Sequence, residues 1–342
     1  MTTSTAYRAL ALQTRCDAIN AIADPAEARA LMAATIARID QQIAASKAFI
    51  GEELRLVVLP EYFLTGFPVG PDLATWQARA CLKPDGTEYR ALGAVAVKHN
   101  IFLSGNAYEI DPAFPDLFFQ VSFILDPSGE RILCYRRLIS MYTATPHDVW
   151  TKFVAHYGDA AALPVVDTEL GCLACVASEE ILFPEVARAL ALKGAEVLLH
   201  SSSEVGSPQL TKKAVAKRAR AIENLAYVVS ANSAGIYGAG IPANSTDGGS
   251  QVIDIEGRVL IEASGGESMV AHAEIDLEHV RRARGRVGMD NYLARLRTEP
   301  FASAYQRAVF PADQLANATP SRATFRAGIE RGIQTLKACR DE

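Results

Sequence analysis

Short apolar runs rich in β-forming residues alternate with helical patterns along most of this chain, and that alternation limits the fold more than any other feature. The strand-like runs cover residues 7–14, 54–60, 101–108, 119–126, 130–137, 172–177, 196–202, 226–232, 250–257 and 269–277. Helical periodicity covers 25–45, 183–193 and 212–225. Strands that alternate with helices predict an α/β fold, and turn residues at 126–129 and 256–257 predict hairpins within a mixed sheet.

The same pattern predicts one large domain followed by an arm. No internal repeat, linker or charge run divides the 342 residues, so we expect one domain over residues 5–285. Residues 286–342 read as a more irregular C-terminal arm that ends in a tail helix. The sequence leaves open whether this arm packs on its own domain or on a neighbouring subunit.

Charge and hydropathy exclude several classes of partner. The formal net charge is −5, without a basic block, which gives no footprint for nucleic acid or for an anionic membrane surface. The N-terminus lacks the pattern of a signal peptide, and no apolar run is long enough to span a bilayer. We therefore expect a cytoplasmic protein whose partner is a small-molecule substrate.

The 6 cysteines are scattered, so we expect free thiols and no disulfide framework. Cys172 and Cys175 form a lone CxxC inside an apolar strand, where their side chains should point to different faces. Without a second Cys or His pair nearby, burial in the core is favoured over a metal site.

Glu61 is the first candidate for chemistry. In LVVLPEYFLTGFP (56–68) an apolar strand runs into Pro60, and the carboxylate follows directly. A carboxylate held at the end of a buried strand could serve as a general base. The alternative is an ordinary solvated glutamate in a loop.

A basic pair and a serine are the next candidates. Arg136 and Arg137 end a strand, so alternation directs one inward and the other, which we expect to be Arg136, to the surface. Ser178 follows the strand CLACVA and precedes Pro184 by six residues, at a strand-to-helix corner. Taken alone, such a serine is typical of a helix cap or turn.

Several blocks in order resemble the nitrilase superfamily of carbon–nitrogen hydrolases. The blocks are LPEYFLTGFP, the YRR strand, FPEVARALALKGAEVLL, RARAIENLAYVVSANSAG, GGSQVIDIEGRVL and AEIDLEHVR, and the likeness runs over residues 7–285. The resemblance implies a four-layer αββα sandwich, assembly as a homodimer or higher homo-oligomer, and a Glu–Lys–Cys catalytic triad. It implies no metal and no organic cofactor.

Two of the three triad positions depart from the family pattern. Glu61 stands at the position of the general base, Arg137 at that of the lysine, and Ser178 at that of the nucleophilic cysteine. A serine hydroxyl is far less acidic than a thiol, so a lone glutamate activates it poorly. Arginine keeps the positive charge for an oxyanion but cannot give up its proton, so it cannot relay one.

Residues near this triad receive weaker predictions. We expect Glu180, two residues after the nucleophile position, and Ser202, in HSSSE, to bind substrate. Cys175 could replace the nucleophile only with a change of strand register. His147 and Asp148 stand where the family often has a second glutamate, and the sequence gives them no role.

The resemblance leaves competing functions. The first is a hydrolase that cleaves a non-peptide carbon–nitrogen bond (amide, nitrile or carbamoyl) of a small polar molecule through a serine ester. The second is a catalytically silent protein that binds a small molecule or a partner, with Arg137 neutralising Glu61. A serine introduced to trap substrate is a third. An α/β-hydrolase is disfavoured because VASEE (176–180) lacks the glycines of a GxSxG elbow.

Overall fold

The computed structural model describes residues 6–69, 72–207 and 209–338 and contains two six-stranded mixed sheets. The first has the order β14-β1-β3-β4-β5-β6, and the second has the order β13-β12-β10-β9-β8-β7. Strands of the first sheet are β1 (Ala6–Ala11), β3 (Leu54–Val58), β4 (Phe102–Asp111), β5 (Phe114–Leu125), β6 (Arg131–Arg136) and β14 (His272–Asp276). Strands of the second are β7 (Val166–Thr168), β8 (Gly171–Ala177), β9 (Val197–Ser201), β10 (Tyr227–Ala231), β12 (Gln251–Ile253) and β13 (Val259–Glu262).

Each sheet has a parallel centre and antiparallel edges. In the first sheet β1, β3 and β4 run parallel, and in the second β8, β9 and β10 do. The predicted hairpins join β5 to β6 and β12 to β13 in antiparallel register. A short parallel pair, β2 (Cys16–Asp17) with β11 (Ile236–Tyr237), stands apart.

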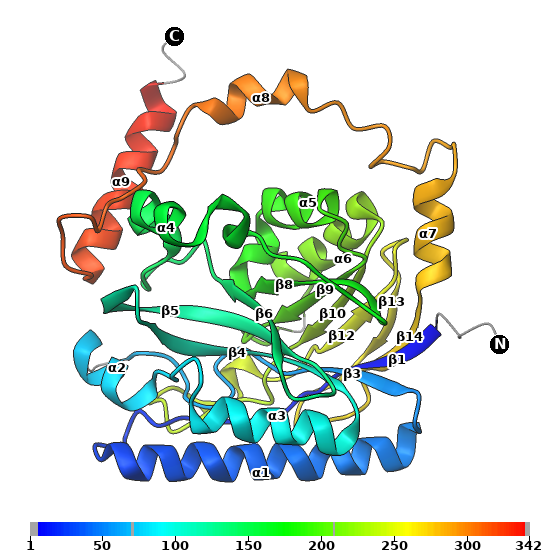
Figure 1. Ribbon diagram of the computed structural model, residues 1–342, viewed down its shortest axis with the longest axis horizontal. Coiled ribbons are helices and arrows are strands. Elements are labelled where there is room, and N and C mark those ends of the chain that lie inside the picture. Colours follow the sequence, from blue (N-terminus) through cyan, green and yellow to red (C-terminus); the bar gives the residue numbers. More distant parts are fainter. Residues whose placement is uncertain (1–5, 70–71, 208, 339–342) are drawn as a thin grey trace.

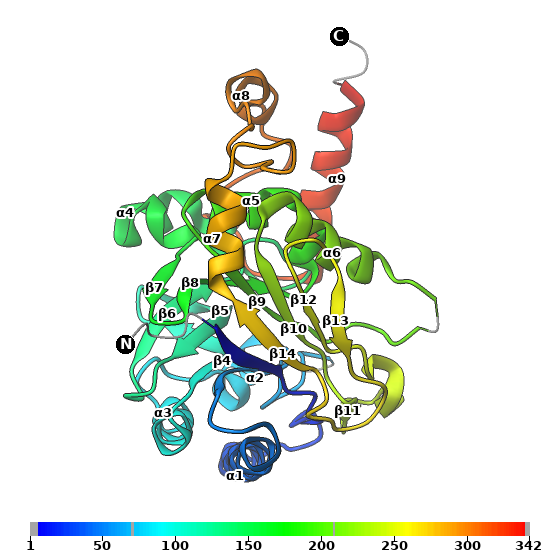
Figure 2. The same ribbon diagram turned by 90° about the vertical axis from the view of Figure 1, so that its right-hand side faces the viewer.

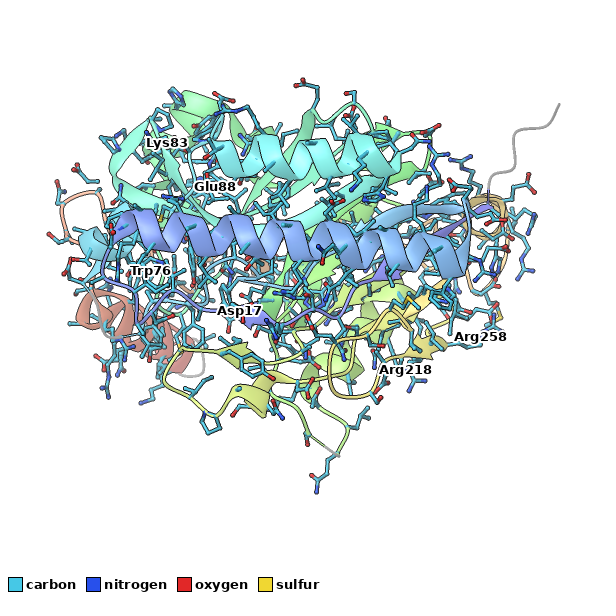
Figure 3. The ribbon with its side chains drawn as sticks, turned by 90° about the horizontal axis from the view of Figure 1, so that it is seen from below. Asp17, Trp76, Lys83, Glu88, Arg218 and Arg258 are labelled. Atoms are coloured by element: carbon cyan, nitrogen blue, oxygen red, sulfur yellow. The ribbon has the colours of Figure 1, made fainter. Side chains whose placement is uncertain are left out.

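Helices cover the outer face of each sheet, which gives the four predicted layers α, β, β and α (Figure 1). The helices are α1 (Pro25–Ile50), α2 (Leu73–Ala80), α3 (Thr87–His99), α4 (Trp150–Tyr157), α5 (Pro184–Leu192), α6 (Lys212–Asn224), α7 (Leu277–Gly285), α8 (Glu299–Gln306) and α9 (Arg322–Ala338). Helices α1 and α3 lie side by side on the outer face of the first sheet (Figure 3). An ion pair of 3.2 Å between Arg29 and Glu88 joins them. Helices α5 and α6 cover the second sheet.

Strand alternation separates the core into layers. In β3, Leu56 and Val58 face the second sheet, whereas Val57 packs toward α1 and α3. In β9, Val197 and Leu199 lie between the sheets, and Leu198 packs against α5 and α6. The sheets therefore pack face to face across an apolar core, as the α/β sandwich requires.

The cysteines agree with the free-thiol prediction where the structure describes them. Cys16, Cys81, Cys134, Cys172 and Cys175 are unpaired, and Cys339 lies outside the described residues. Cys175 is buried between the two sheets, and three residues along a strand place Cys172 on the opposite face. Within the described ranges, no group of three or more metal-ligating side chains gathers in a way that could hold a metal ion.

The C-terminal arm packs partly on its own domain. Leu315 and Phe325 are buried in the same cluster as Val149 and Phe153 of the α4 region. In contrast, α8 has no buried residue, and the hydroxyl of its Tyr305 donates to Glu185 of α5 at 2.9 Å (Figures 1 and 2). No helix in the described part of the chain is both long and apolar enough to cross a membrane.

Candidate active site

The predicted site residues meet where the strands of the two sheets end. Glu61 comes shortly after β3, Arg137 directly after β6, Ser178 directly after β8 and Ser202 directly after β9. Two hydrogen bonds join the two sheets at the ends of these strands. The Ser201 hydroxyl donates to the Leu59 carbonyl (2.8 Å), and the Glu61 amide donates to the Ser202 carbonyl (3.2 Å). The carboxyl ends of parallel strands are where α/β folds place their ligands.

Glu61 is buried, with 1% of its surface exposed, so the solvated-loop alternative is wrong. Its Oε1 accepts hydrogen bonds from Gln120 Nε2 (2.8 Å) and from Arg137 Nη1 (3.3 Å). Gln120, on β5, also donates to Asn106 Oδ1 of β4 at 2.9 Å. A chain of polar side chains in the first sheet thus holds the Glu61 carboxylate in place.

Arg137 is buried, and most of its N–H groups donate hydrogen bonds to acceptors within the protein. Its Nη1 donates to Gln120 Oε1 at 2.6 Å as well as to Glu61, its Nε donates to the Ile139 carbonyl at 2.7 Å, and its Nη2 pairs with Glu179. The carboxylates of Glu61 and Glu179 raise the pKa of this arginine further above its usual range. Since a guanidinium has five N–H donors, one N–H on Nη2 has no partner among the residues that the structure describes and is left for a ligand.

Arg136 corrects a prediction. We expected a surface residue, but its side chain is only 12% exposed and forms an ion pair of 2.8 Å with Asp111. Its guanidinium also lies over the ring of Tyr157, 4.3 Å from the centroid. Arg136 and Arg137 therefore point to opposite faces at the end of β6, and the side chain of each is largely buried.

Ser178 lies at a strained corner. Its φ of 50° is in the left-handed region, which costs a residue with a side chain about 1–3 kcal/mol. His200 Nε2 hydrogen-bonds the Ser178 carbonyl at 2.8 Å, and its Nδ1 contacts Ser230 Oγ at 2.8 Å. Burial holds the pKa of His200 well below its usual value, so the ring is neutral, donates from Nε2 to the carbonyl and accepts at Nδ1.

Glu180 has a set of contacts that the sequence did not predict. Its carboxylate accepts from Tyr135 Oη (2.8 Å), from the amides of Leu138 and Ile139 (2.8 and 3.0 Å) and from the Ala177 amide (3.2 Å). Burial raises its pKa to about 7 despite these donors. The contacts favour a positioning role, which ties the chain after β6 to the Ser178 corner, over the predicted substrate-binding role.

Burial and contacts also define the surroundings of the remaining predicted residues. Ser202 is fully buried, and its hydroxyl lies 3.3 Å from Lys213 Nζ. Cys175 is buried with its Sγ 3.7 Å from Ser104 Oγ, and burial raises its pKa to about 12, so the thiol is not poised for attack. Asp148 accepts from Thr145 and Gln314, and the ring of His147 packs near Phe310, so both anchor the arm.

Sequence reasoning missed Gln120, His200 and Lys213. Gln120 stood in a quoted strand between apolar residues, and an isolated polar side chain in such a run is a usable signal. His200 begins the HSSSE stretch that supplied Ser202. Lys213 gave no signal, because a lysine in the first turn of a helix is typical of a solvated surface.

Comparisons with known proteins show which proteins this chain resembles. The family model described as carbon-nitrogen hydrolase matches residues 21–285. A formamidase of Pseudomonas syringae pv. tomato is 28% identical over 272 residues, which cover 79% of this chain and 74% of that protein. A formamidase of Bacillus thuringiensis is 30% identical over 245 residues, or 71% of this chain and 68% of that protein.

Solved structures show the same fold. Nit3 of Saccharomyces cerevisiae, a member of branch 10 of the nitrilase superfamily, superposes with a TM-score of 0.66 at 21% identity and covers 84% of this chain and 98% of that one. The NitN amidase from Nesterenkonia sp. AN1 gives a TM-score of 0.59 at 19% identity, over 87% of this chain and 99% of that one.

Proposed function

Because the chain belongs to the carbon-nitrogen hydrolase family, we propose that it hydrolyses the carbon–nitrogen bond of a small polar amide, with Ser178 as the nucleophile. The family and the nitrilase-type fold stand as predicted from the sequence. The amide substrate and the Glu61–Arg137–Ser178 set are the proposal.

One observation carries the proposal: a hydroxyl, a buried cation and a buried carboxylate converge at the ends of strands from both sheets. Ser178 Oγ attacks the carbonyl carbon, the amine leaves with a proton, and water hydrolyses the resulting ester. The free N–H of Arg137 Nη2 stabilises the oxyanion. Glu61 fixes the orientation and charge of that guanidinium across their 3.3 Å contact.

The relatives suggest which substrate to try first. Two of them are named formamidases, so formamide and short aliphatic amides are the leading candidates. The homo-oligomer, the small-molecule substrate as partner, the lack of a cofactor and the cytoplasmic location, all expected from the sequence, remain proposals.

The test is ammonia release from formamide, acetamide, short nitriles and carbamoyl compounds. We expect turnover of at least one amide, and a loss of about 10³-fold or more in kcat/KM for Ser178→Ala. The control is Ser303→Ala, on the exposed helix α8, which should match the wild type. Full activity of Ser178→Ala on the same amide would remove serine from the mechanism.

A second candidate function rests on the Arg137–Glu61 pair. Because the two charges neutralise each other inside the protein, they are also what a silent small-molecule binding protein would contain. No turnover by the wild type, together with amide hydrolysis by Ser178→Cys, would support this function and contradict the first. A thiol is ionised far more readily than a hydroxyl, so it should recover activity in an otherwise intact site.

A further inference from the structure

Lys213 reaches the Ser178 corner from the opposite side to Glu61. Its Nζ lies 3.3 Å from Ser178 Oγ and 3.3 Å from Ser202 Oγ, so one amine bridges two hydroxyls. The lysine sits in the first turn of α6, which begins after the N-cap Thr211, whose hydroxyl accepts from the Ala214 amide at 3.0 Å. The half-buried side chain is therefore fixed at both ends.

The carboxylates around Ser178 are all engaged elsewhere. Glu61 accepts from Gln120 and Arg137, Glu179 pairs with Arg137, and Glu180 accepts from Tyr135 and three backbone amides. Among the residues that the structure describes, the hydrogen-bond partner of Ser178 Oγ is Lys213, and no carboxylate contacts that hydroxyl.

The charged side chains around Lys213 pair with groups other than its amine. In the described part of the chain, no carboxylate oxygen lies within 4.0 Å of its Nζ. Glu204 Oε1 is paired at 3.4 Å with Lys217, a second lysine one turn along α6, whereas its buried Oε2 has no partner among the described residues. Lys217 is buried, and burial lowers its pKa. His200, on β9, is neutral, and Arg137 is neutralised by its own pairs.

We propose that Lys213 is the proton-transfer residue of this site, in a Ser178–Lys213 pair supported by the Ser202 hydroxyl. This inference rests on the proposed function and assigns the base that Ser178 needs. Serine–lysine pairs activate hydroxyls in other hydrolases. Here the lysine supplies the proton relay that the arginine at position 137 cannot.

Lys213 carries the proton in both halves of the reaction. Neutral Nζ takes the proton from Ser178 as Oγ bonds to the acyl carbon, and returns it to the leaving nitrogen as the carbon–nitrogen bond breaks. In the second half, Nζ takes a proton from the attacking water, and the same proton goes to Ser178 Oγ as the ester bond breaks. Ser202 Oγ accepts a hydrogen bond from Nζ throughout and keeps the amine aimed at Ser178.

The experiment measures acylation of Ser178 by p-nitrophenyl acetate, by intact mass and peptide mapping, across a range of pH. This activated ester requires only the nucleophile and its base. For the wild type we expect labelling at Ser178. Both Lys213→Ala and Lys213→Arg should be slower by about 10²-fold or more, because a general base contributes about 10²–10⁴-fold. Added propylamine should restore part of the rate of Lys213→Ala.

The controls distinguish proton transfer by Lys213 from effects of the mutations on folding or on charge. The matched variants Lys212→Ala and Lys212→Arg change the exposed neighbour in the same helical turn and should label like the wild type. Wild-type labelling in Lys213→Arg would show that charge alone suffices, and would overturn the proposal. Labelling away from Ser178, or no effect of Lys213→Ala, would overturn it as well. If Ser178 labels through Lys213 while no amide is turned over, the pair stands and the proposed amidase function fails.

Discussion

At the scale of single residues, the site concentrates strain and buried charge. Besides Ser178, Tyr62 next to Glu61 has a left-handed φ of 56°, so the residues at both strand ends are held in unfavourable backbone conformations. The surrounding hydrogen bonds compensate for this cost, because the Glu61 amide is tied to Ser202 of the second sheet and the Ser178 carbonyl is tied to His200 on the neighbouring strand β9. Strain of this kind is typical of sites that position a reactive group.

Glu180 gives a prediction about stability and pH. Its pKa rises from 4.5 to about 7 on folding, so between those values the folded protein binds more protons than the unfolded chain. The free energy of unfolding should therefore fall as pH rises from about 4.5 to about 7, by about 3 kcal/mol from this group. Glu180→Gln should lack that decrease. Urea unfolding of both proteins at several pH values measures the difference.

The control for this prediction is Glu130→Gln, which changes an exposed glutamate in the β5–β6 hairpin. Its stability should follow the wild-type dependence on pH. A parallel pH dependence for Glu180→Gln and the wild type would show that the Glu180 carboxyl does not titrate in this range in the folded protein.

At the scale of elements, β9 supports the corner that follows β8. His200 spans from the Ser178 carbonyl to Ser230 on β10, so one buried ring connects three neighbouring strands. Its loss would leave a buried carbonyl without a donor and would release the left-handed turn. The position of Ser178 thus depends on a residue that never needs to touch substrate.

We predict that His200→Ala lowers the free energy of unfolding by about 2–4 kcal/mol and slows Ser178 acylation. His200→Gln, whose amide can donate to the same carbonyl, should recover part of the acylation rate. Denaturant unfolding and the labelling assay measure the two effects. The exposed His156→Ala serves as the control. Equal acylation by His200→Ala and the wild type would refute a positioning role.

The elements also show what the sequence could predict. Strands, hairpins and the helices α5 and α6 follow from apolar periodicity and turn residues, which act locally. Helix α3 was missed because its pattern is weak and its stability comes from burying Tyr89, Leu92 and Ala96 in the core shared with α1. Glu61 and Ser178 stood out by their positions after strands, and the family resemblance then assigned them to the triad. Lys213 is 35 residues from Ser178, and only the tertiary fold brings them together.

At the scale of the whole molecule, the arm answers a question that the sequence left open. The segment at 313–315 docks on the start of α4: the Asp313 carboxylate accepts from Thr151, and Gln314 donates to Asp148 at 2.6 Å. Helix α9 then packs tightly over this segment, since any side chain at Gly328 would clash with Phe310 and Gln314. This end of the arm therefore packs on its own domain, whereas homo-oligomer formation stays a prediction.

The docking of α9 predicts a local rather than a global effect of mutation. Phe325 is 3% exposed and joins the core of the first sheet, whereas Leu336 in the same helix is 53% exposed. Phe325→Ala should destabilise the docked arm by about 3 kcal/mol, because truncating a buried phenylalanine leaves a cavity. Since the sandwich has its own cores, hydrogen exchange should accelerate in the arm and stay slow in β3, β8 and β9. Leu336→Ala should leave both regions unchanged. Uniform acceleration in the Phe325→Ala protein would mean instead that arm and sandwich unfold as one cooperative unit.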